Sequence, residues 1–116
     1  MAKGNDLQRV RDMLDYARKV QRLSRGRTRA DIDRDELFEL GVTRAVEAIG
    51  EAAAHVSGGI RDRYPSIPWP RIAGMRNRLI HGYDEVDRTL LWKTVTEDIP
   101  LLIIELEKIV PPEPPA

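Results

Sequence analysis

The sequence predicts an all-α protein, an antiparallel up-and-down four-helix bundle, and three observations carry this prediction. Apolar residues recur at spacings of three and four along most of the chain, and no long stretch alternates with the period of two that strands require. Glycines and prolines cluster at 58–70 and prolines again at 111–115. The 116 residues suffice for one buried core. We therefore expect a single helical domain over residues 1–110 and a proline-rich tail over 111–116.

The first two helices are expected before residue 58. Asn5 or Asp6 can cap the first helix, which should end near Leu23 or Ser24. A basic loop with the sequence SRGRTRAD follows it. Asp31 or Asp33 can start the second helix, and its apolar stripe continues to residue 56.

The third helix is expected after a segment rich in proline. Residues 58–70 contain three prolines, which remove amide donors, so this segment should not continue a helix. Pro68 or Pro70 can then occupy the first turn of a helix that ends at Gly82. Inside the second helix, Gly41 and Gly50 each cost about 1 kcal/mol relative to alanine, which suggests close approach of a neighbouring helix there.

The fourth helix should start near Asp87 or Thr89 and extend to Val110. Pro100 lies inside its apolar pattern, so we expect the last helix to be kinked near Pro100. The first and third quarters of the chain are basic, whereas the second and fourth are acidic. Either neighbouring helices of opposite sign attract one another, or the two basic quarters meet at one anionic site.

The composition excludes several classes of function. The 19 basic and 19 acidic side chains balance, which argues against a uniformly basic nucleic-acid-binding surface. The absence of cysteine excludes disulfides and thiol catalysis, and with two histidines we expect no metal site and no cofactor. There is no run of 18 apolar residues and no apolar signal core at the N-terminus. We therefore expect a cytoplasmic protein without a membrane partner.

The two histidines are the side chains that titrate near neutral pH. His55 falls at the end of the second helix, where the dipole favours an imidazolium, and a structural role is expected. His81 lies in the segment GMRNRLIHGYDEVD, which is either a solvated helix end or a phosphodiester site. In the second case Arg76 and Arg78 offer forked donors to phosphate oxygens, and the histidine exchanges a proton. RNA supplies its own nucleophile, the 2′-hydroxyl, so cleavage needs no metal in principle.

Helix geometry constrains this site. Five positions separate Arg76 from His81, so an ideal helix places them roughly 140° apart. Loosening of the last turn before Gly82, the reach of the arginine, or a second chain would be needed to bring them together. A symmetric dimer would also supply a second histidine, so that one acts as base and the other as acid.

Other candidates have mainly structural interpretations. Glu51 projects away from the apolar stripe, which favours exposure or an interface over catalysis. Trp69 and Trp92 fall beside apolar stripes, which favours packing over base stacking. The Arg25–Arg29 loop is either a solvated loop or a source of sequence-independent attraction for RNA.

Arg76, His81 and Tyr83 form the pattern Arg-x4-His-x-Tyr. This pattern resembles the HEPN superfamily, specifically the HepT-like toxins of HEPN/minimal-nucleotidyltransferase toxin–antitoxin pairs. Similar segments occur at Ile49-Gly50-Glu51-Ala52, at Ile67-Pro68-Trp69 and from Asp87 to Trp92. The resemblance covers nearly the whole chain, roughly from Asp6 to Val110.

The resemblance implies a homodimeric four-helix bundle with metal-independent endoribonuclease activity on RNA, tRNA being one candidate substrate. Arg76 and His81 would be the catalytic pair, supported by Asn77 and Arg78. A cognate nucleotidyltransferase antitoxin would attach AMP to Tyr83. The alternative is a non-catalytic nucleotide- or RNA-binding module that docks with a nucleotidyltransferase and is modified by it. The sequence does not separate the two, because binding and cleavage use the same positive groups.

Overall fold

The computed structural model describes residues 5–81 and 85–111, without the side chains of residues 81 and 85. Within these ranges the fold is all-α, as predicted, and the strands are two residues long. The elements in chain order are α1 (Asp6–Ser24), α2 (Arg29–Arg34), α3 (Glu36–Ala54), α4 (Gly58–Arg63), α5 (Trp69–Ala73), α6 (Met75–Leu79), β1 (Ile80–His81), β2 (Glu85–Val86), α7 (Arg88–Lys93), the π-helical segment η1 (Thr94–Asp98) and α8 (Ile99–Glu107).

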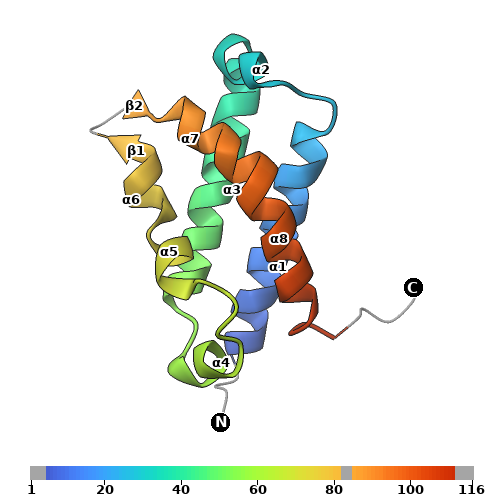
Figure 1. Cartoon of the computed structure of the whole chain (residues 1–116), viewed down its shortest axis with the longest axis vertical. Helices are drawn as coiled ribbons and strands as arrows, with labels where there is room; N and C mark the ends of the chain where they lie inside the picture. The colour runs from blue at the N-terminus through green and yellow to red at the C-terminus, as the bar shows by residue number, and fades with distance from the viewer. Residues whose placement is uncertain (1–4, 82–84, 112–116) are drawn as a thin grey trace.

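Three long helical stretches form the body of the molecule: α1, α3, and the continuous run from α7 through η1 to α8. In Figure 1, α1 ascends, α3 descends beside it, α5 and α6 ascend along one side, and the chain returns through α7 to α8. Helix α1 contacts both α3 and α8, although α1 and α8 lie at opposite ends of the sequence. Residues 1–4 and 112–116, most of the expected tail among them, lie outside the described residues.

The core lies between α1, α3 and α8. Its side chains occur at the helical spacing of three and four that the sequence displays. The fully buried members from these helices are Val10, Met13, Ala17 and Val20 on α1, Val42, Val46, Ile49 and Ala53 on α3, and Ile99 and Leu106 on α8. The limits predicted for the first helix agree with α1.

The second helix predicted from the sequence is wrong in one respect, because it is divided into α2 and α3. The backbone of Asp35 is extended, and its side chain accepts a hydrogen bond from the Phe38 amide at 3.0 Å. Asp35 therefore caps α3, and Asp31 and Asp33, the two expected starting points of the second helix, both lie in α2. Helix α2 begins earlier than expected, at Arg29, where Thr28 and Asp31 form a capping box.

The segment after α3 also differs from the prediction, since Gly58–Arg63 forms the short helix α4. The first proline follows only at Pro65, so nothing in the backbone prevents one and a half helical turns. The buried carboxylate of Asp6 accepts hydrogen bonds from both the amide and the hydroxyl of Ser57. This contact fastens the start of α1 to the start of α4.

The last helical stretch continues past Pro100 without a break. Helix α7 passes into the π-helical turn η1, and α8 begins at Ile99 with Pro100 in its first turn. Proline at this position lacks the amide that an α-helix would use, and the wider π-turn directly precedes it. A kink at this point stays a prediction. None of the described helices is long and apolar enough to cross a membrane.

Candidate functional site

Helix α6 carries three consecutive polar side chains of the predicted motif. Arg76, Asn77 and Arg78 are all exposed, whereas Met75 and Leu79 at its two ends are buried. The buried pair anchors a helix of five residues to the core and fixes which side of it faces outward. The polar part of the motif is therefore presented on the surface.

The backbone before α6 is pressed against α3. A Cβ atom added to Gly50 would lie 3.1 Å from the carbonyl oxygen of Ile72 in α5, closer than such atoms normally approach. The close approach predicted from this glycine is confirmed. Gly41 differs, because an added Cβ would meet only Leu23 at an ordinary 3.8 Å. Gly50 thus determines how near the motif segment lies to α3.

Arg76 reaches back toward α3. Its Nε lies 3.6 Å from Oε2 of Glu47, and the two side chains are 56% and 22% exposed. A pair this open contributes little to stability, so the guanidinium retains donors for a ligand. Sequence reasoning missed Glu47. The available signal was its spacing of three from Arg44 and four from Glu51, which places all three on one helix face.

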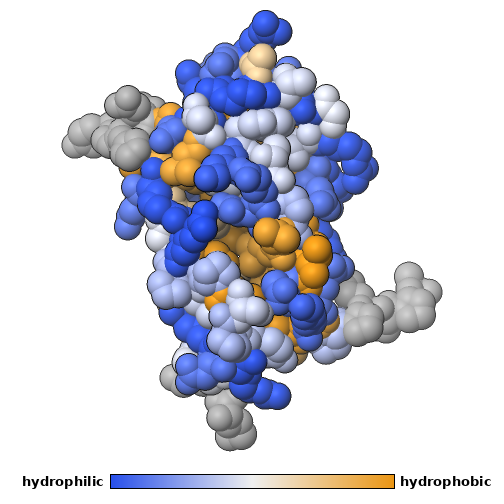
Figure 2. All heavy atoms as spheres, viewed as in Figure 1, coloured by the Kyte–Doolittle hydropathy of each residue, from blue (hydrophilic) through white to orange (hydrophobic). Residues whose placement is uncertain are grey.

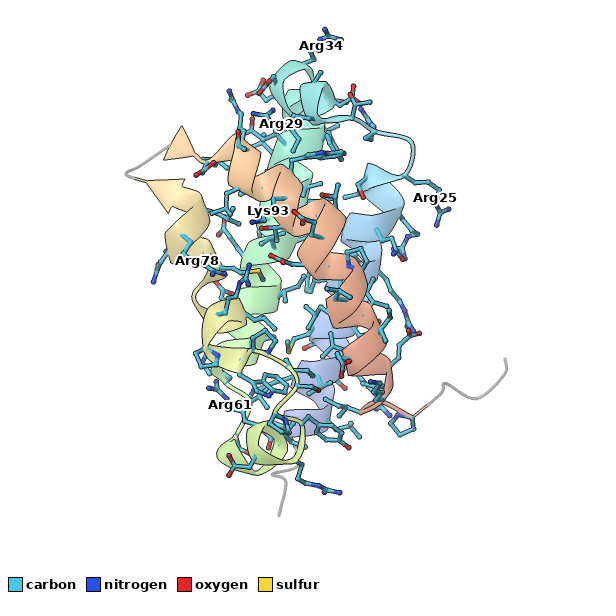
Figure 3. The ribbon with its side chains drawn as sticks, viewed as in Figure 1. Arg25, Arg29, Arg34, Arg61, Arg78 and Lys93 are labelled. Atoms are coloured by element: carbon cyan, nitrogen blue, oxygen red, sulfur yellow. The ribbon has the colours of Figure 1, made fainter. Side chains whose placement is uncertain are left out.

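Arg78 takes a different direction from the same helix. Its guanidinium donates a hydrogen bond of 2.8 Å to the carbonyl of Arg71, and Arg71 pairs with Asp98 of η1 at 3.4 Å. Arg78 is drawn in Figure 3 on the side of α6 that faces this part of the chain. The two arginines of α6 therefore contact different neighbours. Arg76 contacts Glu47 of α3, and Arg78 contacts the backbone of Arg71 in α5.

The helix that carries the motif ends earlier than predicted. The expected end at Gly82 is wrong, because Ile80 is extended and the regular helix stops at Leu79. Ile80 pairs with Val86 and His81 with Glu85 in an antiparallel register. β-Branched isoleucine favours this extended backbone.

The early helix end removes the angular constraint between Arg76 and His81. Loosening of the last turn is one of the three conditions that the sequence left open, and the extended backbone of Ile80 and His81 satisfies it. The side chain of His81 and all of Tyr83 lie outside the described residues, so their predicted roles stay predictions. The amide of Asp87 donates to the carbonyl of Leu79 at 2.7 Å, which closes the base of this hairpin.

An apolar groove borders α6 on the side of Arg78. It has a volume of about 340 Å³ between α5–α6 and α8, with Ile72, Met75 and Leu102 in its floor. Leu101 on its rim is 66% exposed, and Figure 2 shows the hydrophobic patch on this face of the molecule. Sequence reasoning missed this groove, because it assigned the last apolar stripe entirely to the core.

Glu105 lines the same groove at its far end. Its carboxylate accepts hydrogen bonds from Lys108 at 3.0 Å and Ser66 at 2.9 Å. These two donors, Lys108 first, hold the pKa of Glu105 below its ordinary value. These hydrogen bonds therefore favour the charged carboxylate of Glu105 at this end of the groove.

The remaining candidates divide into structural and exposed groups. His55 is the C-cap of α3, and its ring Nδ1 lies 2.8 Å from the carbonyl of Glu51, which accounts for it structurally. Trp69 is 3% exposed and donates from Nε1 to the Tyr64 carbonyl, which confirms packing. Glu51 is exposed, and Trp92 is half-buried.

The arginine loop is partly neutralised by its neighbours. Arg27 pairs with Asp35 at 3.1 Å and lies over the Phe38 ring at 4.7 Å. The Phe38 amide, followed by the Arg27 guanidinium, lowers the pKa of the Asp35 carboxyl. Arg29 pairs with Asp33 at 3.0 Å.

Comparison with known proteins shows which protein family this chain matches. A family model described as "Ribonuclease HepT-like" matches residues 13–109. The chain is 35% identical over 96 residues to "Putative RNase MJ1380" of Methanocaldococcus jannaschii, covering 83% of this chain and 88% of that protein. It is 45% identical over 75 residues to "Probable ribonuclease HepT" of Thermococcus cleftensis, covering 65% and 68%. No solved structure matches it.

Proposed function

Because the chain belongs to the ribonuclease HepT-like family, we propose that it is a metal-independent endoribonuclease in which Arg76 and His81 are catalytic. The observation that carries the proposal is the exposed polar face of α6, held by buried residues at both ends. Asn77 and Arg78 lie on the same helix and support the pair. In this role the chain is the toxin of a toxin–antitoxin pair, built on the up-and-down four-helix bundle that the course of the chain in Figure 1 supports.

The proposed reaction is an internal transfer at an RNA phosphate. The 2′-oxygen loses its proton to an imidazole and attacks the adjacent phosphorus, and the bond from phosphorus to the 5′-oxygen breaks. The products are a 2′,3′-cyclic phosphate and a 5′-hydroxyl, which receives a proton from an acid. Arg76 neutralises the charge that develops on the phosphate oxygens. His81 of one chain is the base, and His81 of a second chain is the acid.

Cleavage in the presence of EDTA tests this reaction on the purified protein. We expect RNA fragments that end in a 2′,3′-cyclic phosphate or its hydrolysis product. A requirement for magnesium would contradict the mechanism. Binding of RNA without any cleavage would support the non-catalytic module instead.

We further propose a homodimer that pairs the open faces of two α3 helices. Leu37 and Leu40 are 81% and 56% exposed, and Arg44, Glu47 and Glu51 continue the same face at spacings of four and three. In an antiparallel pairing centred between Arg44 and Glu47, the arginine of each copy faces the glutamate of the other. Such self-complementarity is what a two-fold interface requires.

The α3 pairing also explains how two motifs come to share a site. Arg76 leans on Glu47, so it lies at the edge of the proposed interface in each copy. Replacing Leu37 with aspartate should convert the dimer to a monomer and abolish cleavage, as measured by light scattering and RNA digestion. The matched control is Leu101→Asp on α8, which is similarly exposed and should leave the mass unchanged. A monomeric Leu101→Asp protein beside a dimeric Leu37→Asp protein would move the interface to the groove.

The proposed partner is a minimal nucleotidyltransferase that modifies Tyr83. The tyrosine oxygen would attack the α-phosphorus of ATP, lose its proton, and release pyrophosphate. The AMP so attached would bring a phosphate close to Arg76 and compete with RNA for it. The modified protein is expected to be folded, dimeric and inactive.

Intact mass spectrometry tests the modification. The protein is incubated with ATP, magnesium and the nucleotidyltransferase encoded next to it. We expect a gain of one or more AMP units that is absent in Tyr83→Phe. A gain that persists in Tyr83→Phe, or no gain, would remove Tyr83 from the mechanism and favour inhibition by occlusion.

A further inference from the structure

A second hollow lies on the other side of α7 from the motif helix. It has a volume of about 400 Å³ and is bounded by the end of α1, the loop after it, α7, η1 and the start of α8. Trp92, Val95 and Pro100 supply its apolar wall, and Gln21 and Arg25 lie among the polar residues that line it. Its size falls in the range of small-ligand sites.

Trp92 differs from the other tryptophan of the chain. Trp69 is buried and its Nε1 donates to a backbone carbonyl. Trp92 is half-buried, and none of the described residues accepts a hydrogen bond from its Nε1. An indole that lines a cleft and has no hydrogen-bond partner for its Nε1 among the described residues can stack on a planar ligand and donate to it. Trp92 therefore packs against the core and also forms part of the cleft wall.

Arg25 carries a charge that no neighbour neutralises among the described residues. It is exposed, and its backbone is extended where α1 ends. Gly26 follows with φ of 74°, a left-handed turn that glycine adopts without strain. After this turn comes Arg27, which is fixed by Asp35 and Phe38 and forms a wall of the same cleft. One arginine is thus held in place, and the other is free to bind.

The charge of the cleft has one sign. Among the described residues that line it, Arg25 and Arg27 are the charged ones, and neither aspartate nor glutamate is present. A cleft lined by both a free guanidinium and an indole fits a nucleotide, because the indole can stack on the base and the guanidinium can pair with the phosphate. Single-stranded RNA offers both groups, since its bases are unstacked.

We propose that this cleft binds one nucleotide of a single-stranded RNA, with the base stacked on Trp92 and its phosphate on Arg25. The choice of RNA as ligand rests on the proposed function. The site is distinct from the motif residues on α6 and takes no part in bond breaking. Its role is to hold the substrate at a second point.

The position of the cleft relative to the motif supports this role. Helix α7 contacts α6, and Trp92 on α7 lines the cleft. In Figure 3, Lys93 of α7 lies between Arg78 on α6 and Arg25 beyond α7. No described residue forms an ion pair with Lys93 or Arg25. An RNA strand that leaves the motif across α7 would meet these cations in turn.

A binding experiment with an oligonucleotide that cannot be cleaved tests the proposal. The probe is a fluorescein-labelled single strand of eight 2′-O-methyl nucleotides, which lacks the attacking hydroxyl. Anisotropy gives Kd, and in a parallel titration an unlabelled strand should quench tryptophan emission in the native protein but not in Trp92→Phe. In the anisotropy assay Trp92→Phe should bind nearly as well as native, whereas Trp92→Leu should bind about fivefold more weakly or worse.

Arg25→Gln is the variant that leaves the fold untouched, because the side chain is exposed on a loop. It should weaken binding and lower the slope of log Kd against log salt by about 0.7, the value for one phosphate contact on a single strand. The matched control is Arg34→Gln on α2, an exposed arginine that does not line the cleft and lies well away from Arg25 in Figure 3. It removes the same charge and should leave the slope unchanged.

Cleavage assays separate this proposal from the proposed function. Trp92→Leu and Arg25→Gln should cut a dinucleotide at the native rate and a long RNA with a raised KM. Native salt slope and Kd in Arg25→Gln, together with unquenched tryptophan emission, would overturn the inference even if cleavage is confirmed. If no RNA is cut but the unlabelled strand still quenches the emission of Trp92, the binding cleft is supported and the proposed function is contradicted. Loss of nucleotidyltransferase binding in Arg25→Gln, with unchanged probe affinity, would make the cleft a protein-docking surface and overturn the inference.

Discussion

The α1–α3 pair and the segment from α5 to β1 bury their side chains in different ways. Helices α1 and α3 are 19 residues each and contribute a continuous apolar stripe, so many contacts share the work of holding each helix. Helices α5 and α6 are five residues each, and their buried anchors are Trp69, Ile72, Met75 and Leu79. Helices α1 and α3 are therefore stabilised by a large buried apolar surface. Helices α5 and α6 are held in position by a few buried side chains.

This difference explains where the polar residues are found. A five-residue helix makes little more than one turn, so it cannot bury a full face, and its intervening side chains face outward. The three that do so are Arg76, Asn77 and Arg78. The arrangement presents chemistry on the surface, but it makes the position of the site sensitive to each anchor.

Truncation of one buried side chain in each region should give the largest effects and separate stability from activity. Ile49→Ala in α3 should lower the free energy of unfolding by about 3–5 kcal/mol, since the surrounding core cannot collapse onto the cavity. Leu79→Ala in α6 should cost less, about 2–3 kcal/mol, because a helix of five residues can shift to fill part of the cavity. Urea denaturation measures both.

The activities should run in the opposite order. At a temperature where both variants are folded, Leu79→Ala should lose more cleavage activity than Ile49→Ala, because Leu79 holds the motif helix. If the two variants lost the same activity for each kcal/mol of unfolding free energy, Leu79 would have no special role in positioning the motif, and this would contradict the comparison.

The two glycines of α3 give a smaller and oppositely directed pair of effects. Gly50→Ala should destabilise by about 1–2 kcal/mol, because its Cβ would press on the Ile72 carbonyl, and this exceeds the gain in helix propensity. Gly41→Ala should stabilise by up to about 1 kcal/mol, since its Cβ has room. The Tm values of the two variants, compared with that of the native protein, test both predictions. Stabilisation by Gly50→Ala would show that α5 does not need to lie so near α3.

The smallest effect concerns pH and the start of α3. The pKa of Asp35 is lowered in the folded state, so its contribution to stability is complete above the ordinary value of 3.8 and is lost as the pH falls through the lower folded pKa. The native protein should therefore lose some stability between pH 6 and about pH 3, measured as a lower urea midpoint. In Asp35→Asn, whose amide oxygen still caps the helix, this decrease should be slightly smaller. Identical pH dependence in the two proteins would mean that Asp35 is not charged in its capping role.

The sequence allowed the long helices to be predicted because their stripes repeat over many residues. The division at Asp35 was missed because Asp31, Asp33 and Asp35 are all good capping residues, and the choice depends on the contacts of Phe38 and Arg27. The short helix at 58–63 was missed because glycine and nearby prolines suggested a loop. Local propensity did not carry enough information in either place.

The motif was found from its spacing, but its surroundings were not. The pair formed by Arg76 and Glu47 joins residues 29 positions apart, and no local pattern connects them. The helix that carries the motif ends at Leu79, and the next residue, Ile80, pairs with Val86 six positions further on, which the helical spacing of the motif does not indicate. The cleft beside Trp92 requires two segments that are far apart in the sequence, 21–27 and 92–100, to meet. Such features follow from packing rather than from the sequence around each residue.

The rate of RNA cleavage by Arg76→Ala and His81→Ala, with EDTA present, tests the central claim most directly. Both variants should remain folded, because the exposed Arg76 makes only a weak pair and His81 is in a two-residue strand. His81→Ala should lose about a hundredfold or more in rate, as expected for general acid–base catalysis. Arg63→Ala, which removes an exposed arginine from α4, should cleave at the native rate. Native activity in His81→Ala would contradict the claim that this motif cuts RNA.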